Sequence, residues 1–283
     1  MIGNTLNFLS IDWDYFIQVS SLERMMLPDG GNENLSSMLQ NFVWTSYYAR
    51  TPKEYGNVSI TYDKVAMAAL RAFLTKRIDP VQTRLCVARS HVEAYEFFSS
   101  FTLPYPEDLL PEDARTEKSQ VRLWNIDDHS DVYGTYGDSS EKLHCGNWLS
   151  KLMYELRPEQ SYNLKSYWVC KDEEYESDPI ADEGYETKLI KMTMNEFLKL
   201  PKQEKFDAVF LCRSDPWSPP HLDTGYQVLA EYLKSKVIKR NVFISKDGQE
   251  SLKNRYDSQF KKTVKGMEPV VSKFRNFNLG YKP

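Results

Sequence analysis

Five short apolar runs recur along the 283-residue chain and alternate with segments of helical periodicity. The runs are TLNFLSID (5–12), TRLCVAR (83–89), VRLWNID (121–127), NLKSYWVC (163–170) and KFDAVFLC (205–212). Helical patterns occupy 34–48, 63–77, 91–100, 146–156 and 222–235. Apolar strands that alternate with helices are typical of a parallel sheet covered on both faces. The sequence therefore predicts an α/β protein, a three-layer α/β/α fold with a mainly parallel central sheet. We expect a single domain over 1–283, in which the polar C-terminal extension 236–283 has no assigned role.

Charge and cysteine usage narrow the class of protein. The formal net charge is −4 with both signs interspersed, which argues against nucleic acid or an anionic membrane as the partner. None of the four cysteines forms a CxxC pair, and Cys86, Cys170 and Cys212 sit in apolar runs, as reduced buried thiols do. A signal peptide and a membrane span are not expected, because no basic leader and no run of about 18 apolar residues occurs. These features predict a cytoplasmic protein.

Acidic and histidine residues gather where the predicted strands end. DDHSD (127–131) follows one strand, and alternate side chains of an extended segment share a face, so Asp127, His129 and Asp131 are expected to point together. Two carboxylates and an imidazole suit Mn²⁺, Fe²⁺ or Zn²⁺. The carboxyl ends of parallel strands converge on one edge of the sheet, where such folds place their sites.

SIDWDYF (10–16) brings a second acidic pair to the same edge. Asp12 and Asp14 end a buried strand, where two carboxylates repel each other and lose hydration unless a cation relieves both costs. The alternative is that the pair serves as a helix cap or in a turn. His91 follows the strand 83–89 almost directly, although a lone histidine there is also typical of a helix start or a packing position.

These motifs together resemble those of the ureohydrolase superfamily, which contains arginase and agmatinase. SIDWDYF resembles its SxDxD motif, DDHSD resembles its DxHxD motif, and His91 resembles its single histidine at an earlier strand end. His144, in KLHCGN and 13 residues after Asp131, matches the context of that family's proton-shuttling histidine. A polar surface position before a helix is the other interpretation of His144. The matching motifs are scattered over residues 10–145.

The resemblance implies two metal ions, most simply two Mn²⁺, with Fe²⁺, Co²⁺ or Zn²⁺ as other options. It implies that Asp12 and Asp127 bridge the ions. By the same resemblance, His91 and Asp131 complete the shell of one ion, and Asp14 and His129 complete the shell of the other. His144 would then transfer a proton to the leaving amine.

The order of the motifs departs from ordinary arginases, in which SxDxD follows DxHxD, so the chain looks permuted by at least one strand–helix unit. This order, GNW (146–148) and CRSDPWSP (212–219) point to the atypical branch that includes peptide arginases. Those enzymes convert arginine to ornithine within ribosomally made precursor peptides. The resemblance therefore implies an arginine-containing precursor peptide as partner, with urea as the second product.

Substrate contacts are assigned more loosely. A guanidinium group needs a planar carboxylate partner, and Asp215 in CRSDPWSP is the candidate, although the family usually has a glutamate in this region. Asn147 and Trp148 are expected in the substrate channel, although Trp148 equally suits a core position. The acidic stretch 172–186, with eight acids and no base, is either a solvated loop or an attractant for a basic peptide.

Three other functions fit the same residues. The substrate could be free arginine, agmatine or a formimino compound, but VYGTYGDSSEK (132–142) lacks the family's polar segment that contacts free α-groups. A single-zinc deacylase of the related deacetylase fold is a second possibility, and the doubled acid pair at 12 and 14 favours two metals over one. A non-catalytic protein that kept its metal site is the third, and the full ligand set with His144 argues against it.

Overall fold

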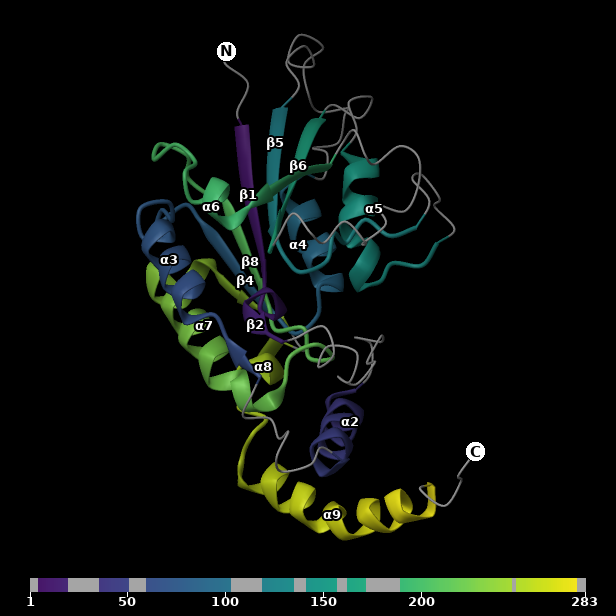
Figure 1. Ribbon diagram of the computed structural model, residues 1–283. Coiled ribbons are helices and arrows are strands. Elements are labelled where there is room, and N and C mark those ends of the chain that lie inside the picture. Colours follow the sequence, from purple (N-terminus) through teal and green to yellow (C-terminus); the bar gives the residue numbers. More distant parts are fainter. Residues whose placement is uncertain are drawn as a thin grey trace.

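The computed structural model describes residues 5–19, 36–50, 60–102, 119–134, 141–156, 162–171, 189–245 and 248–278. Its centre is a seven-stranded sheet in the order β7-β6-β5-β1-β8-β4-β9, and every strand pair in it is parallel (Figure 1). The strands are β1 (Thr5–Asp12), β4 (Arg84–Ala88), β5 (Ser119–Ile126), β6 (Tyr162–Cys170), β7 (Leu189–Thr193), β8 (Ala208–Cys212) and β9 (Val242–Ile244).

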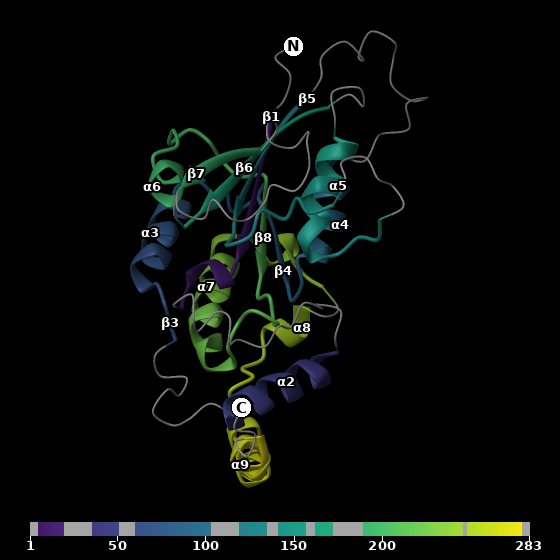
Figure 2. The ribbon, with the colours of Figure 1, turned by 45° about the vertical axis from the view of Figure 1, so that its right-hand side comes forward.

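Helices cover both faces of the sheet, which confirms the three-layer α/β/α prediction. One face carries α3 (Lys64–Leu74), α6 (Met194–Phe197) and α7 (Asp223–Lys236). The opposite face carries α4 (Val92–Thr102) and α5 (Trp148–Glu155) (Figures 1 and 2). Side chains of a strand alternate between faces, so Leu9 and Ile11 of β1 join the first core and Phe8 joins the second. Because both faces are buried, the central strands are apolar almost throughout.

Several elements went unrecognised in the sequence. β7 and β9 extend the two sheet edges, and a short antiparallel pair joins β2 (Ile17–Gln18) to β3 (Thr61–Tyr62). The described part of the chain also contains four 3-10 turns: η1 (Asp14–Phe16), η5 (Cys145–Asn147), η7 (Pro220–Leu222) and η8 (Lys239–Asn241).

The C-terminal extension is part of the fold, since it supplies β9, α8 (Gly248–Ser251) and α9 (Ser258–Asn278). Helix α9 packs against α2 (Ser37–Arg50), and both lie beyond the carboxyl end of β1 (Figure 1).

The acidic stretch 172–186 lies outside the described residues, as does 135–140 of the segment after DDHSD. Among the helices that the structure describes, none has both the length and the apolar character needed to cross a bilayer.

Candidate metal centre

The register of the parallel strands brings the predicted ligands to one edge of the sheet. Asp12 of β1 lies opposite Cys212 of β8, and Ala88 of β4 lies opposite the same cysteine. Ile126, the last residue of β5, lies opposite Ile11. Asp12, Asp127 and His91 therefore leave neighbouring strand ends at nearly the same level, as strand-end convergence predicts.

His91 is the centre of a first group of metal-binding side chains. Its Nδ1 atom lies 3.0 Å from Asp12 Oδ2, 3.3 Å from Asp127 Oδ2 and 3.3 Å from Asp131 Oδ2. All four side chains are buried, with at most 6% of each exposed. Three carboxylates surround one imidazole nitrogen, and a divalent cation held by all four groups would offset the clustered negative charge.

His129 forms a second group beside the first. Its Nδ1 atom lies 3.5 Å from Asp14 Oδ2 and 3.6 Å from Asp127 Oδ1. The two oxygens of Asp127 thus face different imidazoles, and ligand atoms within metal-binding distance form the sets Asp14–Asp127–His129 and His91–Asp127–Asp131. All six predicted ligands are brought together, in two groups that share Asp127.

The backbone of DDHSD differs from the extended segment that the sequence suggested. Residues 127–130 are not part of a strand, and Asp131 has a left-handed backbone with φ of 57°. The His129 amide donates to Asp127 Oδ1 at 2.7 Å, which tightens the bend. The three side chains converge because the chain turns after β5, and the alternation argument for this segment was wrong in its physical reason.

Neighbouring polar groups orient the ligands. Ser10 Oγ lies 3.1 Å from His91 Nε2, which directs Nδ1 of that ring toward the carboxylates. The Trp148 indole donates to Asp131 Oδ2 at 2.5 Å, and the Ser214 hydroxyl donates to Asp12 Oδ2. Such partners fix ligand orientation in metal sites, and their loss typically costs roughly 10- to 100-fold in metal affinity or activity.

Burial and mutual repulsion make the carboxylates poor acids here. Burial, reinforced by the charges of Asp14 and Asp127, raises the pKa of Asp12 to about 8. Burial and the Asp127 charge also raise the pKa of Asp131. Burial opposes protonation of His91 and His129, yet the carboxylates beside them raise the pKa of both imidazoles. Protons thus partly compensate the clustered negative charge, and a divalent cation does the same more completely.

This protonation makes metal binding dependent on pH. Below pH 8 the Asp12 carboxyl is mostly protonated in the metal-free protein, so an incoming ion must displace that proton. We expect the affinity for Mn²⁺ to fall at least about 50-fold between pH 8 and pH 6, because the fall for one displaced proton approaches tenfold per pH unit below the pKa of Asp12. Calorimetry in buffers of different ionisation enthalpy measures both the affinity and the protons released. Equal affinity at pH 6 and pH 8 would contradict this electrostatic account.

The donor set fits a catalytic divalent ion better than a structural one. It consists of four carboxylates and two imidazoles, which suit Mn²⁺ and similar ions, whereas structural zinc prefers closed sets rich in thiolates. The Cys212 thiol also lies near Asp12 and His91, but it accepts the Ser214 backbone N–H at 3.3 Å. The groups border a cavity of about 250 Å³, whose described lining is Asp12, His91, His129, Asp131, Tyr133, Cys145, Gly146, Ser214 and Trp217.

His144 is not itself among the described residues that line this cavity, but it immediately precedes Cys145 and Gly146, which are. The ring Nδ1 of His144 accepts the Gly146 backbone N–H at 3.2 Å, and the backbone N–H of His144 donates to Asn147 Oδ1 at 2.7 Å. These two hydrogen bonds cap the start of η5. The ring Nε2 of His144 lies 3.8 Å from Glu141 Oε1. The ring is partly exposed and paired with a carboxylate, an arrangement compatible with proton transfer as well as with capping.

Two of the predicted channel residues serve other purposes in the structure. Asn147 is fully buried and holds the turn, with its amide donating to the Lys142 carbonyl at 3.0 Å. Trp148 is also fully buried and belongs to the core under α5, with its indole N–H on Asp131. Neither is among the described residues that line the cavity. Trp148 therefore acts on the site through Asp131.

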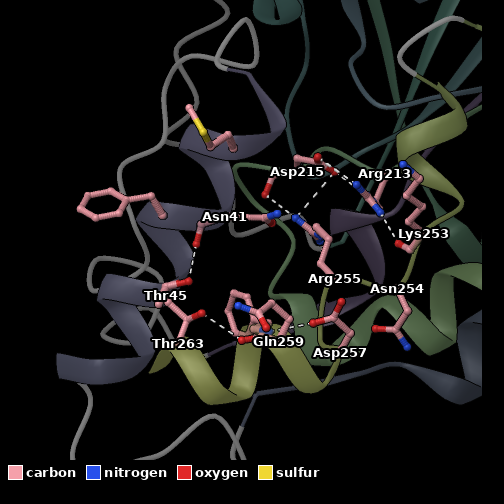
Figure 3. A pocket seen from close by; sticks show the side chains of 13 residues that line it. Asn41, Thr45, Arg213, Asp215, Lys253, Asn254, Arg255, Asp257, Gln259 and Thr263 are labelled. Carbon is pink, nitrogen blue, oxygen red and sulfur yellow. Dashed lines mark hydrogen bonds and ion pairs between the residues drawn. The ribbon is translucent and has the colours of Figure 1, made fainter. Parts of the chain in front are cut away.

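Asp215 is engaged by cations of the chain itself. Arg213 donates to both of its carboxylate oxygens, Arg255 lies 3.6 Å from Oδ1, and Arg89 lies 3.7 Å from Oδ2. Figure 3 shows Arg213 and Arg255 converging on this carboxylate in a second cavity, whose described lining includes none of the metal ligands. Burial opposes its ionisation, but Arg255 and Arg213 lower the pKa of Asp215. The predicted guanidinium partner is thus already occupied by internal guanidinium groups.

Comparisons with known proteins add no relative. The chain matches no protein-family model, no curated protein and no solved structure.

Proposed function

We propose that this chain is a binuclear metal-dependent hydrolase that converts arginine residues of a peptide to ornithine and releases urea. The observation that carries the proposal is the position of Asp127, whose two oxygens face two separate imidazoles, each with further carboxylates around it. A single-metal enzyme has no need of the second group formed by Asp14 and His129.

The family resemblance supplies the ligand roles, and the contacts of Asp127 with both imidazoles support its part in them. Asp12 and Asp127 would bridge two ions, His91 and Asp131 would complete the shell of one, and Asp14 and His129 that of the other. We assign Mn²⁺ as the physiological metal, because oxygen-rich ligation with imidazole suits it. When bound, the metals supply an activated water and polarise the group that is attacked.

The protein's own side chains supply orientation and protons. Ser10, Ser214 and Trp148 hold three of the ligands in place. His144 would deliver the proton that the leaving alkyl amine requires, and Glu141 beside Nε2 would help to keep the His144 ring in its orientation. Without this proton the amine is a poor leaving group, so the step depends on an acid near the cavity.

A peptide is favoured over free arginine by what surrounds the cavity. None of its described lining residues is a lysine or an arginine, and each lining carboxylate belongs to a metal-binding group. The free α-carboxylate of an amino acid would find no cationic partner among these described residues. A substrate whose α-groups are in peptide bonds does not need one.

The compartment is proposed from the thiols. The four cysteines, all of them described, form no disulfide bond, and Cys86, Cys170 and Cys212 are buried. This usage fits a reducing environment, and we place the protein in the cytoplasm.

One assay tests the proposed activity. The Mn²⁺-loaded protein is incubated with arginine-containing peptides, free arginine and agmatine, and urea is measured together with ornithine in the peptide. We expect kcat/KM to be highest for the peptides. Equal rates on free arginine would replace the peptide substrate by an ordinary arginase activity, and the absence of urea from every substrate would overturn the proposal.

A further inference from the structure

Trp217 is set apart from the other tryptophans of the chain. Five of the six are at most 1% exposed: Trp13, Trp44, Trp124, Trp148 and Trp168. Trp217 is partly exposed and lines the metal-bordered cavity, with its ring centroid 5.4 Å from that of His129. An aromatic side chain of this size that is left open beside a metal ligand is available to a bound ligand.

Hydrogen bonds within the loop and from Arg255 hold the loop that carries Trp217. The Trp217 and Ser218 amides both donate to the Ser214 carbonyl at 3.0 Å, and Arg255 donates to the Ser218 carbonyl at 2.7 Å. Arg255 is itself held by Asp223 through hydrogen bonds of 2.7–3.2 Å. Trp217 therefore projects from a rigid support, which reduces the entropy lost when a ligand stacks on it.

Among the described residues that line the cavity, none offers a spare carboxylate for a planar cation. Asp12 and Asp131, the carboxylates among its described lining, belong to the metal groups, and Asp215 is taken by Arg213. Tyr133 is the second aromatic side chain in the lining, and it approaches Gly146 so closely that a Cβ there would lie 2.8 Å from its ring. Recognition of a cation in this cavity consequently falls to aromatic faces.

We propose that Trp217, with Tyr133 as the second aromatic wall, binds the guanidinium group of the substrate by stacking and cation–π attraction. This specificity site rests on the proposed function above, because it takes the substrate to be an arginine side chain. Guanidinium groups stack on indole faces, and the attraction strengthens where water is excluded. The neutral ureido group of citrulline has nearly the same shape but lacks the charge, so the site discriminates between the two.

The test uses the full-length Mn²⁺-loaded protein and two probes, N-acetyl-arginine amide and its citrulline counterpart. Stopped-flow tryptophan fluorescence records binding before turnover. We expect a saturable change with the arginine probe, a much weaker one with the citrulline probe, and loss of the change in Trp217→Phe. Equal responses to both probes would overturn a cation-selective site.

Steady-state kinetics on an arginine peptide supply the second readout. Trp217→Leu should raise KM roughly tenfold with its metal content unchanged, and Trp217→Phe should recover most of the loss because it keeps an aromatic face. Phe243→Leu, at an exposed aromatic residue outside the cavity lining, serves as control. An unchanged KM in Trp217→Leu, or loss of its metal, would overturn the site even while urea is released. If no substrate yields urea but the fluorescence still distinguishes the probes, the binding site stands and the proposed hydrolase fails.

Discussion

Asp127→Asn is expected to lose most of the bound metal and to lower urea release by more than about 100-fold. Loss of a residue that only orients a metal ligand costs up to about 100-fold. Asp127 should cost more, because it presents one carboxylate oxygen to each of the two metal-binding groups. The amide keeps the size of the side chain but removes the charge that would offset two cations. Metal content by atomic emission and urea release on an arginine peptide measure the two effects.

The neighbouring residue offers a matched control. Asp128 is also buried, but it is absent from the metal-binding sets, and its Oδ1 atom lies 3.1 Å from Lys171 Nζ. Asp128→Asn should therefore keep both ions and most of the activity. Two ions and full activity in Asp127→Asn would contradict the site assignment. A native protein that binds one ion only would return the single-zinc deacylase as the better interpretation.

The strand ends explain why the ligands could be found from the sequence. Asp12, His91 and Asp127 each follow a run that is apolar enough to identify a buried strand, and parallel strands bring their carboxyl ends together whatever their separation in the chain. The edge strands were harder to recognise. β9 has three residues in a polar context, and β7 has two exposed side chains among its five.

The role of Asp215 depended on contacts that no local pattern reveals. Arg213 is two residues away, but Arg255 comes 40 residues later in the segment whose role was unassigned. A carboxylate at a strand end is available to bind a substrate only if no lysine or arginine of the same chain already pairs with it. Here burial favours pairing with the chain's own guanidinium groups, since a buried charge is costly without a partner.

The residues that orient the ligands, Ser10, Ser214 and Trp148, were also missed, each for its own reason. Ser10 stands inside the SxDxD motif, so its contact with His91 could have been inferred from the motif. Ser214 has a left-handed backbone with φ of 50°, and this turn lets its hydroxyl donate to Asp12. No residue type in CRSDPWSP predicts that backbone conformation. The fully buried Trp148 looked like a channel residue because sequence spacing does not distinguish the face toward the cavity from the face toward the core.

His144→Asn is expected to lower turnover by roughly 100-fold or more while metal content stays the same, the usual range for a general acid–base group. Asparagine is the informative replacement, because His144 also caps η5 through Nδ1 and asparagine is among the best capping residues. The variant should therefore keep the turn and its thermal stability but lose the imidazole. A matched His144→Ala variant, which lacks the cap as well, separates the catalytic loss from the structural one.

Added imidazole provides the decisive measurement for His144. If the ring donates a proton to the leaving amine, imidazole in solution should restore part of the turnover of His144→Ala, in which the space of the ring is open. The partly exposed position of His144 gives such a molecule access. The same addition should leave Asp127→Asn unaffected, because that variant lacks a ligand and not a proton donor. Full turnover in His144→Asn would show that this histidine only caps η5. The proton for the leaving amine would then have to come from Glu141 or from water.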